Sequence, residues 1–182
     1  NEGWAGILIG AGEGSLDYRA SALIHHSPGK AGGIVIAVNE NGQVVFLDNT
    51  NNRELIGSMQ KLPEQNYPDS LLLSIDIYLN EDSTYTISAS AVDQATRDQV
   101  SHNNLTKIPI ERIEGNIAVA ANHIEKGLEG PSYWFGKLNV KGDALERTSD
   151  HRFGPVMGVM HTLSDGVLKL TAQMPPIGEA DE

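Results

Sequence analysis

The chain has 182 residues, 40% of them apolar, which is enough for one domain with a real core and excludes a disordered chain. Its 13 basic and 24 acidic residues give a net charge of −11, which repels phosphate backbones and argues against a nucleic-acid partner. Cysteine is absent, which excludes disulfides and thiolate metal sites, and no run reaches the roughly 20 apolar residues of a membrane span.

Apolar residues in the first half of the chain recur mostly at every second position, which predicts strands rather than helices. The pair Asn41-Gly42 favours a tight hairpin turn, because both residues readily adopt positive φ. The strands predicted here are residues 5–9, 20–25, 33–38 and 43–47.

The clearest hairpin of the sequence lies at residues 71–92. Residues 71–79 and 84–92 both alternate apolar and polar side chains, and the polar run 80–83 between them predicts the turn. A short helical turn is predicted at residues 109–114. Further strands are predicted at residues 116–121, 133–140, 155–163 and 167–174.

Many strands at short spacing predict an all-β fold, an antiparallel β-sandwich or barrel, rather than a βαβ fold. Residues 143–152 are rich in charge and read as a linker. The predicted organisation is therefore a β-sandwich over residues 1–142, followed by a linker and strands over residues 143–182 that lead into another domain.

Two adjacent histidines, His25 and His26, are the most conspicuous polar pair. Neighbouring residues of a strand point to opposite faces, so the two cannot readily bind one metal ion. One could be buried and hydrogen-bonded while the other lies at the rim of the sheet. Both a structural role and a ligand-binding role stay open.

The run 48–52 contains hard oxygen ligands that could hold a calcium ion, namely Asp48, Asn49 and Asn51. The same composition is typical of an ordinary polar turn stabilised by side-chain hydrogen bonds to the backbone. No other cofactor is indicated.

Three aromatic residues stand together at positions 133–135. The alternation places Trp134 on one face with Leu138 and Val140, which predicts a core position. Tyr133 and Phe135 lie on the other face, where they could pack or stack on a sugar ring.

No catalytic residue is predicted. Glycoside hydrolysis needs two facing carboxyls about 5–9.5 Å apart. The sequence contains neither the carboxylate triplet of sandwich glucanases nor a G-x-S-x-G nucleophile elbow. Catalysis by this chain alone is therefore not expected.

The first third of the chain contains GWAGILIGAG at 3–12, DYR at 17–19, LIHHSPG at 23–29 and GQVVFLDN at 42–49. Together these stretches resemble the concanavalin A-like (laminin G-like) lectin and glucanase sandwiches. YWFGKLNVKG at 133–142 is similar to the closing strand of such domains. The resemblance implies a jelly roll, here incomplete at its N-terminal side.

The last part contains FGPV at 153–156 and HTLSDGVLKLTAQMPP at 161–176. These stretches resemble the junction in exported PhoD-like alkaline phosphatases, where a sandwich leads into a metallophosphatase domain. The metal-ligand motifs of that domain do not occur in this chain. The resemblance implies a bacterial protein exported to the periplasm or the outside.

Three classes of function follow. The first is a non-catalytic accessory module that binds carbohydrate or another surface polymer, or packs on a following catalytic domain. The second is a glucanase- or lyase-type enzyme, and the third a purely structural interdomain module. If preceding strands are missing, the edge from Trp4 to Ile9 would be open, and self-association through it is expected.

Overall fold

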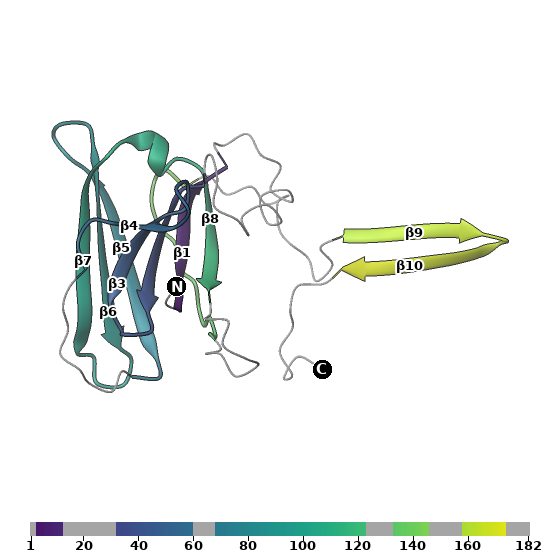
Figure 1. The fold of residues 1–182 in the computed structure, drawn as a ribbon, viewed down its shortest axis with the longest axis horizontal. Helices are drawn as coiled ribbons and strands as arrows, with labels where there is room; N and C mark the ends of the chain where they lie inside the picture. Colours follow the sequence, from purple (N-terminus) through teal and green to yellow (C-terminus); the bar gives the residue numbers. More distant parts are fainter. Residues whose placement is uncertain (1–2, 13–31, 60–67, 123–132, 146–157, 174–182) are drawn as a thin grey trace. The chain divides into compact units, whose positions relative to one another are not determined.

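The structure is a computed structural model that describes residues 3–12, 32–59, 68–122, 133–145 and 158–173. These residues form antiparallel strands and one 3₁₀ turn, so the predicted all-β class is confirmed (Figure 1). Among them there is no helix that could span a membrane. The chain divides into two compact units, Asn1–Leu138 and Asn139–Glu182. The predicted domain boundary at residue 142 stays a prediction.

A five-stranded sheet forms one layer of the first unit. Its strands are β1 (Trp4–Ala11), β2 (Ile34–Asn39), β3 (Val44–Asp48), β4 (Glu54–Ile56) and β8 (Asn116–Asn122). Their order across the sheet is β4–β3–β2–β1–β8.

β1 therefore lies inside this sheet, paired with β2 on one side and β8 on the other. The expected open edge from Trp4 to Ile9 is wrong, because strands from later in the chain satisfy both of its sides.

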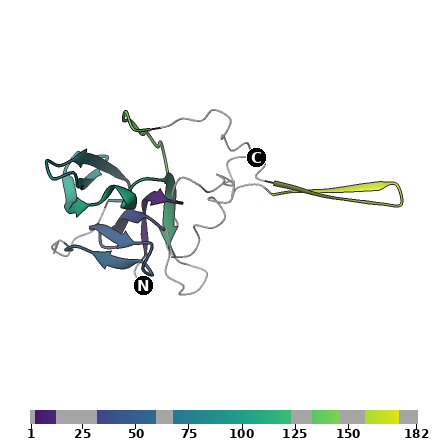
Figure 2. The same cartoon turned by 90° about the horizontal axis from the view of Figure 1, so that it is seen from above.

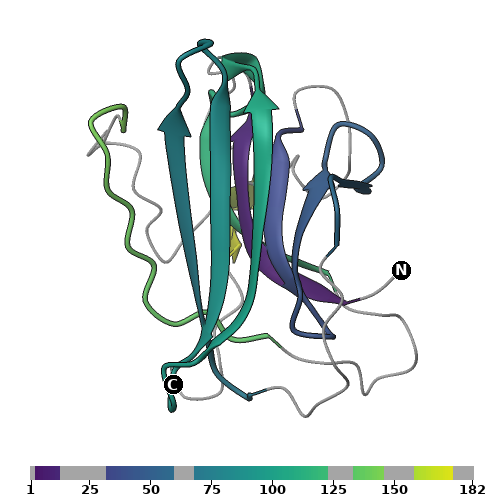
Figure 3. The ribbon, with the colours of Figure 1, turned by 90° about the vertical axis from the view of Figure 1, so that its left-hand side faces the viewer.

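A three-stranded sheet forms the other layer. It consists of β5 (Leu71–Leu79), β6 (Tyr85–Asp93) and β7 (Gln99–Ile108), in that order. The predicted hairpin is confirmed, with Asn80 and Thr84 hydrogen-bonded across the turn between β5 and β6. A 3₁₀ turn, η1 (Ile110–Arg112), follows β7 at the predicted place. Figures 2 and 3 show the two sheets of this unit as two layers.

The main core lies between the two layers and is built by the alternate apolar residues of facing strands. The five-stranded sheet contributes Ile9, Ile34, Ile36, Val44 and Phe46, and the three-stranded sheet contributes Ile87, Ala89, Ala91, Leu105 and Ile108.

Polar contacts also join the two layers at β7, which was not predicted as a strand. The Val44 amide donates to Ser101 Oγ at 2.9 Å, and Asn103 Nδ2 donates to the Val44 carbonyl at 3.1 Å. The same Asn103 amide donates to the Ser58 carbonyl at 2.7 Å. Because Ser101 and Asn103 take inward positions, β7 lacks the apolar alternation that marks β5 and β6.

The other face of the five-stranded sheet carries a second cluster of buried residues, namely Trp4, Leu8, Ala11, Val35, Ala37 and Val45. The guanidinium of Arg53 covers the Trp4 ring at 5.6 Å from its centroid. Gly6 lies on this face against the backbone of β2, where a Cβ atom would meet the carbonyl oxygen of Ile36.

The second unit contains one antiparallel hairpin, β9 (Gly158–Ser164) and β10 (Val167–Gln173). Asp165 and Gly166 both have positive φ, as a tight hairpin turn requires. Its two strands confirm the described part of the predicted strands 155–163 and 167–174.

Candidate functional site

The outer face of the three-stranded sheet carries a cluster of polar side chains that the core does not use. Ile87 and Ala89 point inward, so Ser88 and Ser90 of the same strand point away from the core. The strand register aligns polar residues of β5 and β7 with them. We call this surface the polar face; it consists of Ser74, Asp76, Ser88, Ser90, His102 and Asn104.

Two rows of side chains cross the polar face, on the sheet that forms the front layer in Figure 3. The first row is Ser74, Ser90 and His102, and the second is Asp76, Ser88 and Asn104. The rows meet where Ser88 Oγ lies 3.3 Å from His102 Nε2. Tyr78, 51% exposed, follows Asp76 on the same face of β5 and adds an aromatic ring beside the second row.

The side chains of the polar face can both donate and accept hydrogen bonds. Serine hydroxyls, the Asn104 amide and the His102 ring offer both functions, while the Asp76 carboxylate accepts. A flat tyrosine ring can cover the apolar side of a ligand and still hydrogen-bond through its hydroxyl. This combination fits a ligand rich in hydroxyl groups.

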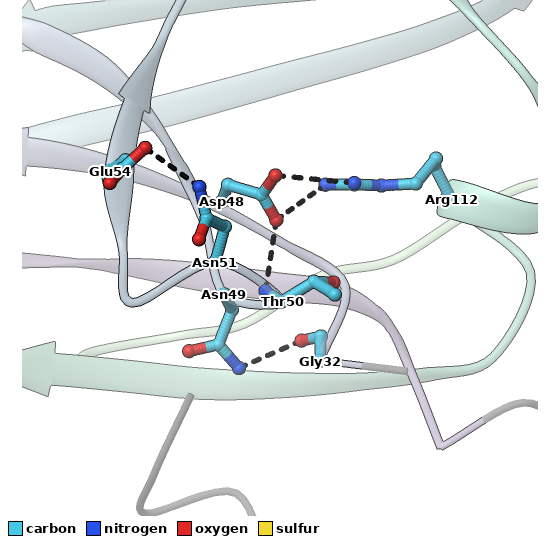
Figure 4. Close-up of polar contacts among 7 residues, drawn as sticks. All are labelled: Gly32, Asp48, Asn49, Thr50, Asn51, Glu54 and Arg112. Atoms are coloured by element: carbon cyan, nitrogen blue, oxygen red, sulfur yellow. Dashed lines mark hydrogen bonds and ion pairs between the residues drawn. The ribbon is translucent and has the colours of Figure 1, made fainter. Parts of the chain in front are cut away.

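The predicted calcium loop lies elsewhere, at the end of β3 (Figure 4). Both oxygens of Asp48 face the guanidinium of Arg112, at 2.8 Å from Nη2 and 3.3 Å from Nη1. The Thr50 amide also donates to Asp48 Oδ1 at 2.9 Å, which closes the turn. The paired geometry is typical of an arginine–carboxylate ion pair.

These contacts explain the acidity of Asp48. Burial raises the pKa of its carboxyl, but the hydrogen bonds and charge of Arg112 and the amides of Thr50 and Asn51 outweigh burial. The pKa of Asp48 therefore lies below its ordinary value of 3.8.

The two asparagines of this loop are also engaged. Asn49 is buried, donates to the Gly32 carbonyl at 2.8 Å and accepts from Arg53 Nε at 3.2 Å. Asn51 donates to Glu54 Oε2 at 2.7 Å. All of these bonds stabilise the loop between β3 and β4, and calcium binding by it stays a prediction.

The aromatic segment differs from its predicted arrangement. Residues 133–140 form no strand, and Trp134 is 83% exposed, so the core position predicted for Trp134 is wrong. Tyr133 is instead the partly buried member, with its hydroxyl beside Gly3 and no hydrogen-bond partner in the described part of the chain. Burial, together with the nearby charge of Glu40, raises the pKa of Tyr133. Phe135 is exposed, as a stacking role would require.

His25 and His26 lie outside the described residues, so neither the structural nor the ligand-binding role is decided. In the parts of the chain that are described, no three histidine or acidic side chains gather as a metal site.

The polar face was not among the sites predicted from the sequence. The available signal was the second alternation in β7, where His102, Asn104 and Thr106 alternate with Ser101, Asn103 and Leu105. Comparison with known proteins adds no assignment, because no family model, curated protein or solved structure matches this chain.

Proposed function

We propose that this chain is a non-catalytic β-sandwich module that binds an uncharged carbohydrate, or another hydroxyl-rich surface polymer, through its polar face. The observation that carries the proposal is the alignment of six hydrogen-bonding side chains in two rows on one exposed sheet surface, with Tyr78 beside them.

Charge supports a neutral ligand. The chain carries a net charge of −11, and the polar face itself contains the carboxylate of Asp76, so a polyanion would be repelled. A neutral polymer has no charge repulsion to overcome when it approaches this surface, and it gains hydrogen bonds along the two rows.

Binding is proposed rather than turnover because of the carboxyl groups. Asp76 is the single carboxylate of the polar face, whereas glycoside hydrolysis uses a facing pair. The finer context of the proposal is a concanavalin A-like jelly roll within an exported, bacterial PhoD-like metallophosphatase. Its support is the sequence resemblance described above.

A panel of neutral and acidic polysaccharides tests this function, with the full chain as the probe on a glycan array. The proposal expects retention on at least one neutral polymer, and weaker retention of Asp76→Asn, which replaces a charged acceptor by a neutral amide. Glu111→Gln makes the same change on the exposed turn η1 and should bind like the unchanged protein.

Two results would contradict the proposal. One is the absence of binding across the panel, and the other is an equal loss for Asp76→Asn and Glu111→Gln. Turnover of a polysaccharide above blank would favour the enzyme alternative instead.

A further inference from the structure

The two layers of the first unit differ in width, with five strands against three. Contacts between β3 and β7 align one end of the smaller sheet with β3. β5, at its other end, is therefore directed toward the β8 side of the larger sheet. Val119 of β8 is paired with Ile7 of β1, and Ile7 packs on the main core, so Val119 faces the space between the layers. Val119 is nevertheless 43% exposed, which shows that the smaller sheet does not fully cover this side.

β5 is the edge strand of the smaller sheet. In the described ranges, it pairs with β6 on one side and with no strand on the other. Its inward residues Ile77 and Leu79 are 41% and 62% exposed, and Asp76 is its only charge. Natural edges of this length are usually protected by lysine, proline or a covering segment. We call this region the β5–β8 edge, comprising Ile77, Leu79, Ile117 and Val119.

The hairpin of the second unit has complementary chemistry. Its register places five apolar residues on one face, namely Val159, Leu163, Leu168, Leu170 and Ala172, with His161 opposite Leu170 on the same face. The opposite face is more polar and carries Thr162, Ser164, Lys169 and Thr171 together with Met160 and Val167. Leu170 is 64% exposed, and an isolated two-stranded hairpin is at best marginally stable in water. The hairpin therefore needs a sheet or a layer to pack against.

We propose that the β5–β8 edge binds the β9–β10 hairpin of a second copy of this chain, with β10 pairing against β5. The addition would extend the smaller sheet from three strands to five, matching the larger sheet. The alternation of β10 would direct Leu168 and Leu170 toward Ile117 and Val119. Lys169 would then lie on the outer side, where Asp76 supplies the opposite charge.

A second copy fits because each chain carries one such edge and one such hairpin. Two chains can exchange hairpins about a two-fold axis, which closes the assembly and satisfies both edges. This assembly goes beyond polymer binding and would place two polar faces in one particle.

Light scattering of the full chain across a tenfold range of concentration tests the exchange. The mass is expected to rise from 19.6 kDa toward twice that value. Leu170→Lys should weaken the dimer at least tenfold, because a buried leucine is replaced by a charge. Thr171→Lys adds the same charge to β10 on the side opposite Leu170 and should leave the dimer intact.

A mixing experiment identifies the surfaces. Ile77→Lys damages the edge and Leu170→Lys damages the hairpin, so each variant alone should be monomeric while their mixture forms a dimer through the one intact pair. Circular dichroism and melting of Ile77→Lys show whether its fold is kept, and Val119→Lys is the second edge variant if it is not. A constant mass near 19.6 kDa, a mixture that stays monomeric, or equal dissociation by Thr171→Lys would each overturn the proposal.

Discussion

Asn103 joins the two layers through its side-chain amide, and its replacement by alanine is expected to destabilise the first unit strongly. The substitution removes the donor of two hydrogen bonds, to the carbonyls of Val44 and Ser58. It also removes the Oδ1 atom that accepts the Asn104 amide at 2.9 Å. Because Asn103 is only 8% exposed, water cannot freely replace these partners.

The magnitude follows from the groups left without partners. An unsatisfied buried polar group costs about 1–3 kcal/mol, and the Val44 carbonyl is the buried one of the two acceptors. With the Ser58 carbonyl partly buried, we expect Asn103→Ala to lower the free energy of unfolding by about 2–4 kcal/mol. The matched control is Asn104→Ala, an exposed neighbour on the same strand, for which a change within about 0.5 kcal/mol is expected.

Urea unfolding measures the stability of both variants. The change in the free energy of unfolding is obtained from the shift of the transition midpoint, provided that the slope of the transition is unchanged. A loss below about 1 kcal/mol for Asn103→Ala would refute the reasoning, because it would mean that these bonds are replaced at little cost. An equal loss for Asn104→Ala would refute it as well, since that change leaves the contacts between the layers intact.

Three further outcomes are expected in unfolding experiments. The Asp48–Arg112 pair contributes stability at pH values above 3.8, the ordinary pKa of the carboxyl, and this contribution is lost as the pH falls through the lowered pKa of Asp48. On acidification the wild type should therefore lose about 1 kcal/mol more free energy of unfolding than Asp48→Asn. Parallel acid titrations of the two proteins would contradict this. Gly6→Ala should lower the free energy of unfolding by about 2–3 kcal/mol, because its Cβ would meet the backbone of β2. Gly136→Ala is the control and should leave stability unchanged, since a Cβ there meets nothing within 4 Å. Equal losses for the two variants would contradict the packing. Tyr133→Phe should raise the free energy of unfolding by about 1 kcal/mol, because it removes a buried hydroxyl that has no hydrogen-bond partner among the described residues. A clear loss of stability would show that the hydroxyl is satisfied.

Much of the fold could be predicted where the core-facing positions of a strand are apolar. β5 and β6 alternate in that way around a polar turn, and both strands lie within one residue of their predicted ends. β7 was missed because two of its inward positions hold Ser101 and Asn103, which bond to the opposite layer instead of filling it. Alternation also predicted a strand at 133–140, but it cannot tell whether a segment finds a pairing partner.

The polar face could not be predicted from the sequence because it depends on register between three strands. Asp76, Ser88 and Asn104 are separated by 12 to 28 positions in the sequence, and only the pairing of β5, β6 and β7 places them in one row. By contrast, the loop at 48–52 drew attention because its polar residues are adjacent. The side-chain oxygens of Asp48 and Asn49 in this loop are engaged by Arg112, Arg53 and the backbone.

Nuclear magnetic resonance titration of the isotope-labelled chain with a neutral polysaccharide from the panel tests the central claim most directly, because it locates the bound surface residue by residue. The account predicts that the amides of Ser88, Ser90, His102 and Asn104 shift together with concentration. Shifts confined to the loop at Asp48, or the absence of shifts with every neutral polymer of the panel, would contradict it.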